Sequence, residues 1–209
     1  MRTFLATALL GAIPALMAVI TTPKLDLHAA INAHHNPVTD TLFKYITHLG
    51  DGLTASVVAL FLLLRVNWRA FLLAATGLLS SSILVQLLKR TIFSGEDRPW
   101  AFLGQMPGVQ LVAGIDLNHH FSFPSGHSAS IFALCFALAT VIGRQSMAFG
   151  LAVLACVVAF SRVYLSQHFT ADILGGALLG MMGSLGAYWW LHHSPFSQRP
   201  WLERSPFRR

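Results

Sequence analysis

Charged side chains are scarce in this sequence. Only 11% of its 209 residues are Asp, Glu, Lys or Arg, and the acids number only 8. A soluble domain carries about 25% charged residues, so this chain lacks the polar side chains that a water-facing surface requires. Hydrophobic residues make up 55% of the sequence, and the mean hydropathy is +0.61. These values exclude an ordinary soluble domain and favour an integral membrane protein.

Cysteine is also rare: Cys135 and Cys156 both lie inside apolar stretches. Two such residues do not form a disulfide framework, and we expect them to be small packing residues. The net charge of +6 comes from bases scattered between apolar runs and near the C-terminus. No basic helix face with interleaved aromatic residues is present. We therefore expect no nucleic-acid partner and interpret the charge as a signal of membrane topology.

A membrane-spanning helix needs about 20 mainly apolar residues, and six stretches of the sequence approach that length. They predict an all-α integral membrane protein with six transmembrane helices, folded as a single domain over residues 1–209. The first stretch, which follows Arg2, also fits a cleaved signal peptide. The six expected spans are residues 3–21, 51–66, 69–88, 127–143, 147–165 and 171–191.

Six spans place both termini on one side of the membrane, and the distribution of bases indicates which side. The terminal side holds eight bases and one acid, Glu203, whereas the other side holds six bases and seven acids. We therefore predict a multi-pass protein of the cell inner (cytoplasmic) membrane with both termini cytoplasmic. The long loops 22–50 and 89–126 are expected on the periplasmic side. The basic tail, residues 192–209, is expected to lie on anionic lipid or to be disordered.

Three separated segments gather titratable residues on the predicted periplasmic side. The first runs from Lys89 to Arg98-Pro99, the second is residues 124–127 (Pro-Ser-Gly-His), and the third is residues 161–172. Catalysis of phosphoryl transfer depends mainly on positioning and on positive charge. Lys89, Arg98 and Arg162 supply that charge, and arginine binds two phosphate oxygens at once.

The second and third segments carry the remaining chemistry. Ser125 fits an N-cap, so the first N–H groups of the following helix are free to bind an anion, and Gly126 permits a close approach. His168 and Asp172 are four residues apart, which places them on one face if the helix has begun there. A carboxylate behind an imidazole fixes its tautomer and leaves the other nitrogen free to attack. His127 is then available to protonate a leaving oxygen.

These segments resemble the three signature motifs of the type-2 phosphatidic acid phosphatase superfamily, membrane lipid phosphate phosphatases related to vanadium haloperoxidases. Residues 124–127 match the second motif, and residues 161–172 match the third with its expected spacing. The first motif has Lys, six residues and Arg-Pro, but eight residues separate Lys89 from Arg98 here. The two extra residues leave Lys89 and Arg90 as alternative anchors of the first motif.

The resemblance implies metal-independent hydrolysis in two steps through a phosphohistidine at His168, with no cofactor. It implies that Asp172 orients His168 and that His127 is the general acid. It also implies a phosphate-binding set of Lys89, Arg98, Ser125, Gly126 and Arg162. The pairs His34-His35 and His119-His120 suggest metal ligands, but no Cys or carboxylate partners are arranged around them. We therefore predict no metal site.

The sequence thus predicts a lipid phosphatase or diphosphatase with its active site at the periplasmic interface and membrane lipids as partners. A polyprenyl diphosphate such as undecaprenyl diphosphate is the favoured substrate. Phosphatidylglycerol phosphate, phosphatidic acid and lipid A phosphates are alternatives. A transporter of phosphorylated lipids would use the same cations, and so would a phosphatase of soluble substrates or a phosphotransferase that passes the phosphate to an acceptor other than water. The sequence does not indicate an oligomeric state.

Overall fold

Eight α-helices form most of the computed structural model, which describes residues 1–206. That part of the chain contains no β-strand. The α-helices are α1 (Arg2–Thr21), α2 (Lys24–Asn32), α3 (Pro37–Ile46), α4 (Gly52–Arg65), α5 (Trp68–Arg90), α6 (Gly126–Ile142), α7 (Gln145–Tyr164) and α8 (Thr170–His193). Four short 3-10 helices complete the fold: η1 (Thr47–Gly50), η2 (Pro99–Gln105), η3 (Pro195–Gln198) and η4 (Pro200–Glu203).

All six predicted spans are helical, and each helix begins and ends within two residues of its prediction. Among the helices of residues 1–206, only α1, α5, α7 and α8 are long and apolar enough to cross a membrane alone. Helix α4 has 14 residues and α6 has 17. The segment Pro37–Gly50 and α4 form a pair bent by 54° that qualifies as one further span. Length and composition therefore identify four spans, or five with the bent pair, and not six.

The predicted loop 22–50 is largely helical, and capping explains why. Asn36 accepts backbone N–H bonds from Val38 and Thr39, and Pro37 occupies the first position of α3. Both features favour a helix start at this point. Asn67 caps α5 in the same way by accepting from the N–H of Ala70. Local polar residues therefore determine where these helices begin.

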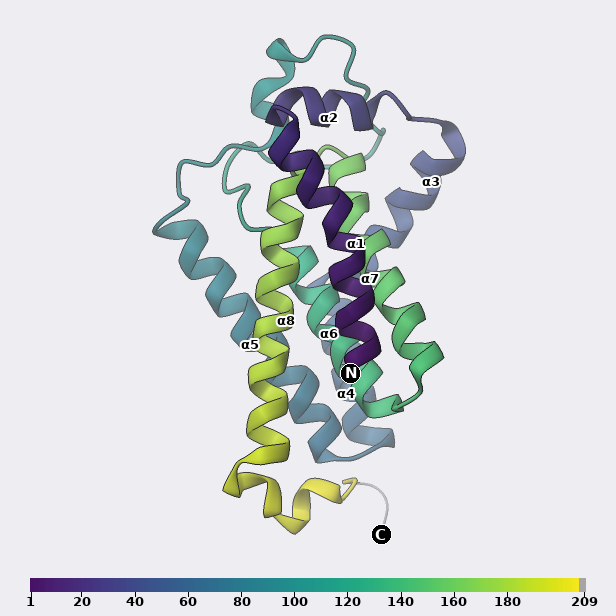
Figure 1. Cartoon of the computed structure of the whole chain (residues 1–209), viewed down its shortest axis with the longest axis vertical. Helices are drawn as coiled ribbons and strands as arrows, with labels where there is room; N and C mark the ends of the chain where they lie inside the picture. Colours follow the sequence, from purple (N-terminus) through teal and green to yellow (C-terminus); the bar gives the residue numbers. More distant parts are fainter. Residues whose placement is uncertain (207–209) are drawn as a thin grey trace.

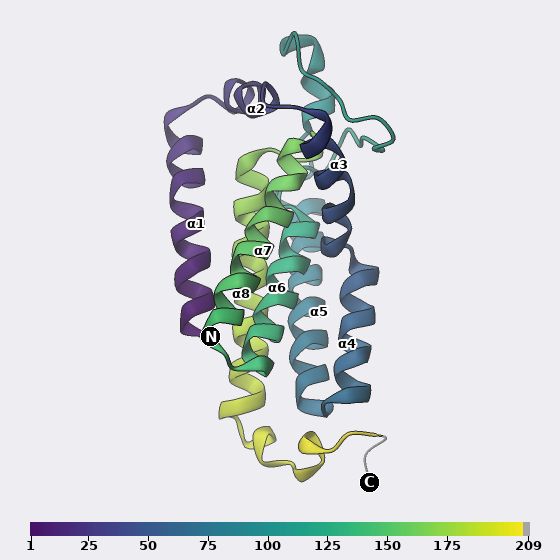
Figure 2. The same cartoon turned by 90° about the vertical axis from the view of Figure 1, so that its right-hand side faces the viewer.

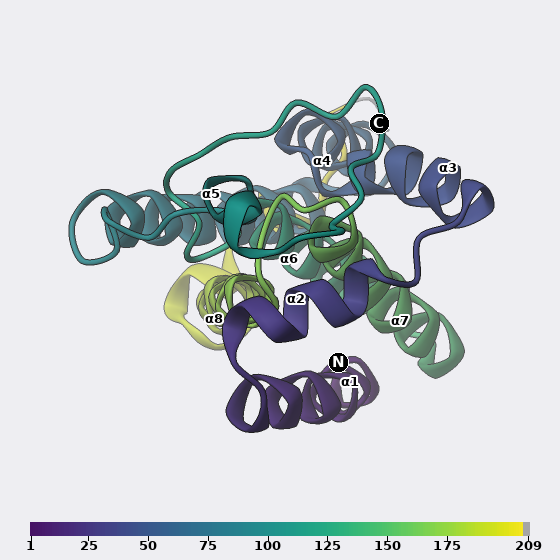
Figure 3. The ribbon, with the colours of Figure 1, turned by 90° about the horizontal axis from the view of Figure 1, so that it is seen from above.

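The helices form a bundle with the loops and α2 at one end (Figure 1). The turned view shows α1 on the outside, α2 crossing above the bundle, and α3 leading down into α4 (Figure 2). Seen from above, the loop between α5 and α6 arches over that end of the bundle (Figure 3). The chain therefore runs down α4, up α5, down α6, up α7 and down α8. The ends of α5 and α7 and the starts of α6 and α8 all face the loop end.

Helix α8 packs closely against α5 and α6 through small residues. A methyl group at Gly180 would overlap the backbone of Ala129 on α6, and one at Gly183 would overlap Ser81 on α5. Small residues at such positions let membrane helices approach closely. Large apolar residues such as Leu10, Ile20 and Leu53 instead point outward and are 67%, 70% and 78% exposed. Exposed apolar side chains of this kind fit a surface that faces lipid hydrocarbon.

The C-terminal tail does not behave as predicted. Residues 194–206 fold back against α5 as η3 and η4, and Leu202 is fully buried. The ring of Trp201 packs edge-on against Trp68, and Glu203 pairs with Arg69 at 2.5 Å. The predicted disorder is therefore wrong for this stretch, which is ordered around the buried Leu202, and the predicted contact with anionic lipid stays a prediction. Arg208 and Arg209 lie outside the described residues.

Candidate active site

The three sequence segments meet at the loop end of the bundle, and Lys89 brings in the first of them. Lys89 is the next-to-last residue of α5 and is only 7% exposed. Its nearest charged neighbours include Arg98, Asp172 and Arg162. Arg90 is exposed and donates to Gln86 on its own helix at 3.4 Å. Of the two candidate anchors, Lys89 therefore faces the site.

His168 and Asp172 form a buried pair, although not in the way the spacing suggested. Helix α8 begins at Thr170, so His168 lies in the preceding connection rather than on a shared helix face. Asp172 reaches back instead: its Oδ2 accepts from His168 Nδ1 at 3.3 Å and from the N–H of Phe169 at 2.8 Å. Ser122 also donates to Oδ2, at 2.5 Å. The cap of α8 thus doubles as the partner of His168.

Burial keeps His168 neutral. The side chain is 2% exposed, and desolvation lowers its pKa from 6.5 to about 3 despite the hydrogen bond to Asp172. With the proton on Nδ1 directed at Asp172, the lone pair of Nε2 is free. A neutral imidazole with a defined tautomer is the form that acts as a nucleophile. His168 therefore has the protonation state that attack on phosphorus requires.

The start of α6 lies against this pair. Ser125 caps α6 by accepting from the N–H of Ser128 at 3.4 Å, and its own N–H donates to the carbonyl of Asp172 at 2.9 Å. A methyl group at Gly176 would overlap the carbonyl of Ser125, which shows how tightly α8 holds this segment. The positive end of the α6 dipole at Gly126 is therefore fixed beside the His168 pair.

Two arginines join the cluster through Gln167, a residue that the sequence analysis missed. Gln167 Oε1 accepts from Arg98 at 3.4 Å and from Arg162 at 3.2 Å. Its amide nitrogen donates to the carbonyl of Asp116 at 2.5 Å. Arg162 is 8% exposed, and its Nε–H has no partner among the described residues. An unpaired N–H on a buried cation is well suited to an anion.

Segment 47–51, which precedes α4, also contributes to the site. Thr47 Oγ1 accepts from Arg162 at 2.9 Å, and Asp51 Oδ1 lies 2.6 Å from His127 Nε2. The sequence analysis counted Asp51 only as a charge on the periplasmic side and did not single out Thr47. The available signal was an acid directly after Gly50, at the start of an apolar helix. Asp51 lies beside His127 because of the bend between α3 and α4, and nothing in the sequence indicated that bend.

Two further histidines, His28 and His35, lie near this cluster. His28 of α2 is 1% exposed and bonds Ser166 Oγ at 3.1 Å, and burial lowers its pKa to about 4. His35 stacks on Tyr164 and pairs with Asp40 at 3.0 Å. Within residues 1–206, no group of three or more His, Cys, Asp or Glu side chains is arranged to hold a metal ion. These histidines support the loops around the site.

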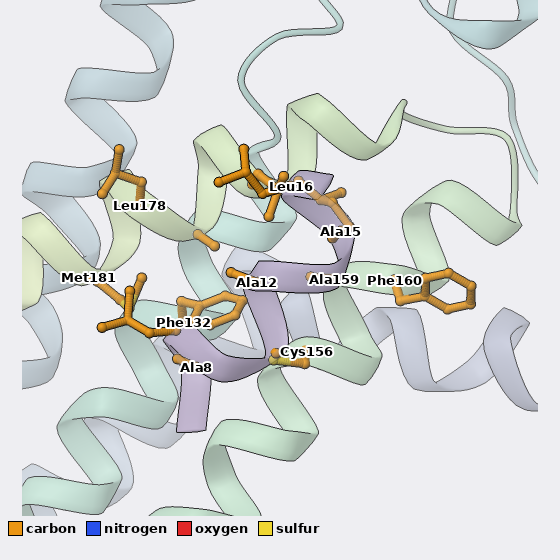
Figure 4. A pocket seen from close by; sticks show the side chains of 15 residues that line it. Ala8, Ala12, Ala15, Leu16, Phe132, Cys156, Ala159, Phe160, Leu178 and Met181 are labelled. Carbon is orange, nitrogen blue, oxygen red and sulfur yellow. The ribbon is translucent and has the colours of Figure 1, made fainter. Parts of the chain in front are cut away.

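Two apolar hollows lie within the helical bundle. The α4–α5 hollow, about 400 Å³, is lined by α4 from Gly52 to Ala59, by α5 from Phe71 to Ser82, and by Ser130 of α6. The α1–α8 hollow, about 380 Å³, lies between α1, α7 and α8. Figure 4 shows its lining, including Ala12 and Leu16 of α1 and Leu178 of α8. Both offer hydrocarbon-lined space among the membrane-type helices.

Over the described residues, fold and site together define a helical, membrane-type protein with a cluster of cations around a histidine–carboxylate pair. Residues 69–195 match the family model described as the PAP2 superfamily. Because this match covers more than half of the chain, the protein belongs to the PAP2 superfamily. The matched region contains all eight predicted site residues.

Known relatives agree with that assignment. Over 78 residues the chain is 46% identical to the "Putative undecaprenyl-diphosphatase YbjG" of Escherichia coli (strain K12), covering 35% of this chain and 38% of that protein. Over 125 residues it is 34% identical to the "Lipid A 1-phosphatase" of Rhizobium johnstonii, covering 58% and 48%. The chain therefore spans less than half the length of both relatives. The crystal structure of Aquifex aeolicus LpxE superposes with a TM-score of 0.68 at 26% identity, covering 81% of this chain and 98% of that one.

Proposed function

We propose that this protein hydrolyses a phosphate ester or diphosphate carried by a lipid, through a phosphohistidine at His168. The observation that carries the proposal is the buried His168–Asp172 pair, in which a neutral imidazole lies among three cations. Binding alone would need the cations but would not need an oriented nucleophile. The names of the curated relatives, both phosphatases of lipids, support the same conclusion.

The reaction has two steps. His168 Nε2 attacks phosphorus, the bond to the leaving oxygen breaks, and His127 gives that oxygen a proton. Water then attacks the phosphohistidine, His127 takes a proton from the water, and inorganic phosphate leaves as Nε2 is restored. Asp172 keeps its hydrogen bond to Nδ1 throughout and stabilises the positive charge that forms on the ring.

Charge stabilisation comes from the surrounding groups. The transition state spreads negative charge over the equatorial oxygens of the transferred phosphoryl group. Lys89, Arg98 and Arg162 bring positive charge to those oxygens, and the N–H groups at Ser125 and Gly126 add the helix dipole. Because the N–H of Arg162 Nε has no partner among the described residues, it is ready to donate to the phosphate.

The favoured substrate is a polyprenyl diphosphate such as undecaprenyl diphosphate. The 46% identity to the relative named for that activity supports it. The α4–α5 hollow begins at Gly52, next to Asp51, and includes Ser130, one turn below His127. It therefore offers a path for a hydrocarbon chain whose headgroup lies at His127. A lipid A phosphate is the second candidate, favoured by the match to the Lipid A 1-phosphatase.

The proposed location is the cell inner membrane, with the site on the periplasmic side and both termini cytoplasmic. The excess of bases on the terminal side supports this orientation. Reporter fusions after Arg209 and within loop 106–118 test it. We expect the fusion after Arg209 to behave as cytoplasmic and the fusion in loop 106–118 to behave as periplasmic. The reverse pattern would place the site on the cytoplasmic side.

Phosphate release by the purified protein in detergent tests the function directly. The substrate panel contains undecaprenyl diphosphate, lipid A, phosphatidylglycerol phosphate and phosphatidic acid. We expect release that is lost in His168→Ala but kept in His34→Ala, a matched histidine variant outside the site. Binding of these lipids without release would instead indicate a transporter. Transfer of the phosphate to an added alcohol would indicate a phosphotransferase.

A further inference from the structure

Asp51 lies outside the three motifs, yet it makes the shortest ion pair to a histidine of the site. We infer that Asp51 is the positioning residue for His127 and favours the protonated form that a general acid requires. This inference rests on the proposed function, because it assigns a role within the same reaction. It identifies the segment Thr47–Asp51 as a fourth functional segment of the chain.

The geometry resembles the His168 pair with the nitrogens exchanged. Asp51 Oδ1 lies 2.6 Å from His127 Nε2, whereas Asp172 Oδ2 accepts from His168 Nδ1. The Nδ1 of His127 has no protein partner among the described residues, and the side chain is 31% exposed. Nδ1 is therefore the nitrogen that can donate to the leaving oxygen. Each histidine thus has one nitrogen held by a carboxylate and one directed to the substrate.

His127 needs such a partner because its surroundings oppose a positive charge. Burial disfavours protonation most, and the two cations that face His127, Arg162 of α7 and Arg98 of the α5–α6 loop, disfavour it further. Asp51 is the anion that faces it from the helix break, and it opposes these effects in part. On its far side Asp51 accepts from His48 Nδ1 at 2.8 Å. Without Asp51, burial and the two arginines would disfavour the protonated general acid still more.

Packing fixes the segment that carries Asp51. A methyl group at Gly50 would lie 3.2 Å from the carbonyl oxygen of His127 and 3.3 Å from Cγ1 of Val158. Gly50 therefore lets the chain run directly against the start of α6. Thr47, at the other end of η1, accepts from Arg162 at 2.9 Å. The same short helix thus contacts both the general acid and a phosphate-binding arginine, which ties their positions together.

Leaving-group dependence separates this role from simple structural support. A general acid contributes roughly 10²- to 10⁴-fold when the leaving oxygen is strongly basic. It contributes little when the leaving group departs readily as an anion. Decyl phosphate, with an alkoxide leaving group, and p-nitrophenyl phosphate, with a stable phenolate, form a matched pair of monoester probes. We would measure kcat/KM for both with wild type, Asp51→Asn and Asp51→Glu, after confirming that each variant unfolds at a similar temperature.

We expect Asp51→Asn to reduce kcat/KM at least about 100-fold for decyl phosphate and less than about 5-fold for p-nitrophenyl phosphate. Asp51→Glu should restore part of the loss. Asp97→Asn, which removes another carboxylate bonded to a histidine, His120, should change neither rate. Equal losses on both substrates, or a faster Asp51→Asn enzyme, would overturn the inference while leaving the proposed function intact. A wild-type protein that releases phosphate from neither probe nor from any lipid would overturn both.

Discussion

Asp172 Oδ2 lies 3.3 Å from His168 Nδ1 although His168 precedes the first turn of α8. The same oxygen accepts the N–H of Phe169, so one carboxylate both caps the helix and orients the histidine. The start of α8 and the orientation of His168, the proposed nucleophile, therefore depend on the same carboxylate. The connection 165–169 cannot shift without breaking the cap, which holds His168 in place without a helix of its own.

Lys89 and Arg90 are the alternative anchors of the first motif, and substituting each of them tests which one binds phosphate. Lys89→Met should lower kcat/KM for a lipid phosphate by roughly 10- to 100-fold, because a buried charge-assisted bond to phosphate contributes about 1.5–3 kcal/mol. Arg90→Met removes an exposed base that bonds only Gln86 among the described residues, and it should change the rate less than about 3-fold. Initial-rate measurements compare the two. A larger effect of Arg90→Met would assign the anchor to Arg90.

Close packing of α8 predicts a sharp contrast between two of its glycines. Gly180→Ala would force a methyl group into the backbone of Ala129 and should lower the free energy of unfolding by about 1–3 kcal/mol. Gly186 has no neighbouring atom within 4 Å of an added methyl group, so Gly186→Ala should be neutral or slightly stabilising. Thermal unfolding in detergent measures both. Equal melting temperatures would show that α8 does not approach α6 this closely.

Two buried histidines predict that the protein loses stability in mild acid. Burial lowers the pKa of His28 to about 4 and that of His168 to about 3, below the value of 6.5 expected in the unfolded chain. Between pH 6.5 and 4 the unfolded chain therefore binds more protons, and the free energy of unfolding falls as the pH falls. Each histidine contributes on the order of 1 kcal/mol per pH unit in that window. Melting curves from pH 7 to 4.5 should show the decline.

His28→Gln provides the control for that decline. Glutamine keeps a donor for Ser166 but does not titrate, so the variant should lose less stability than wild type over the same range. At pH 7 its melting temperature is expected to be lower, because Gln fills the buried position less well. Identical pH slopes for variant and wild type would show that His28 is not held neutral by burial.

The two apolar hollows distinguish alternative paths for the lipid chain. Ala75→Phe fills the α4–α5 hollow and should lower kcat/KM for a long-chain substrate about 10-fold or more, since each buried CH₂ contributes about 0.8 kcal/mol. Its rate with p-nitrophenyl phosphate should stay near that of wild type. Ala12→Phe fills the α1–α8 hollow and should affect neither substrate. If Ala12→Phe lowered the rate with the long-chain substrate and Ala75→Phe did not, the lipid chain would be assigned to the α1–α8 hollow instead.

The sequence predicts the motifs well because each depends on residues close together in the chain. The Pro-Ser-Gly-His cap and the spacing of His168 and Asp172 are local patterns, and the helices that carry them are strongly apolar. Asp51 and Gln167 could not be predicted in the same way. Asp51 reaches His127 only because α3 and α4 meet at a bend, and Gln167 acts only through two arginines distant in sequence.

The C-terminal tail is a second region whose structure the sequence did not predict. Its Pro- and Arg-rich composition predicts a surface segment, yet Leu202 is fully buried and Glu203 pairs with Arg69. The few apolar residues of this segment, Phe196, Trp201 and Leu202, give no periodic signal. Only the three-dimensional position of Trp68 and Arg69 at the start of α5 shows where Leu202 can be buried.

The covalent intermediate is the central claim, and trapping it is the most direct test. The protein would be mixed with substrate labelled in its transferred phosphate, quenched within one turnover in alkali, where phosphohistidine survives, and digested for peptide mapping. The account predicts label on the peptide that contains His168, none in His168→Ala, and rapid loss of the label in acid. Label that persists in His168→Ala, or a wild type that turns over without ever becoming labelled, would contradict it.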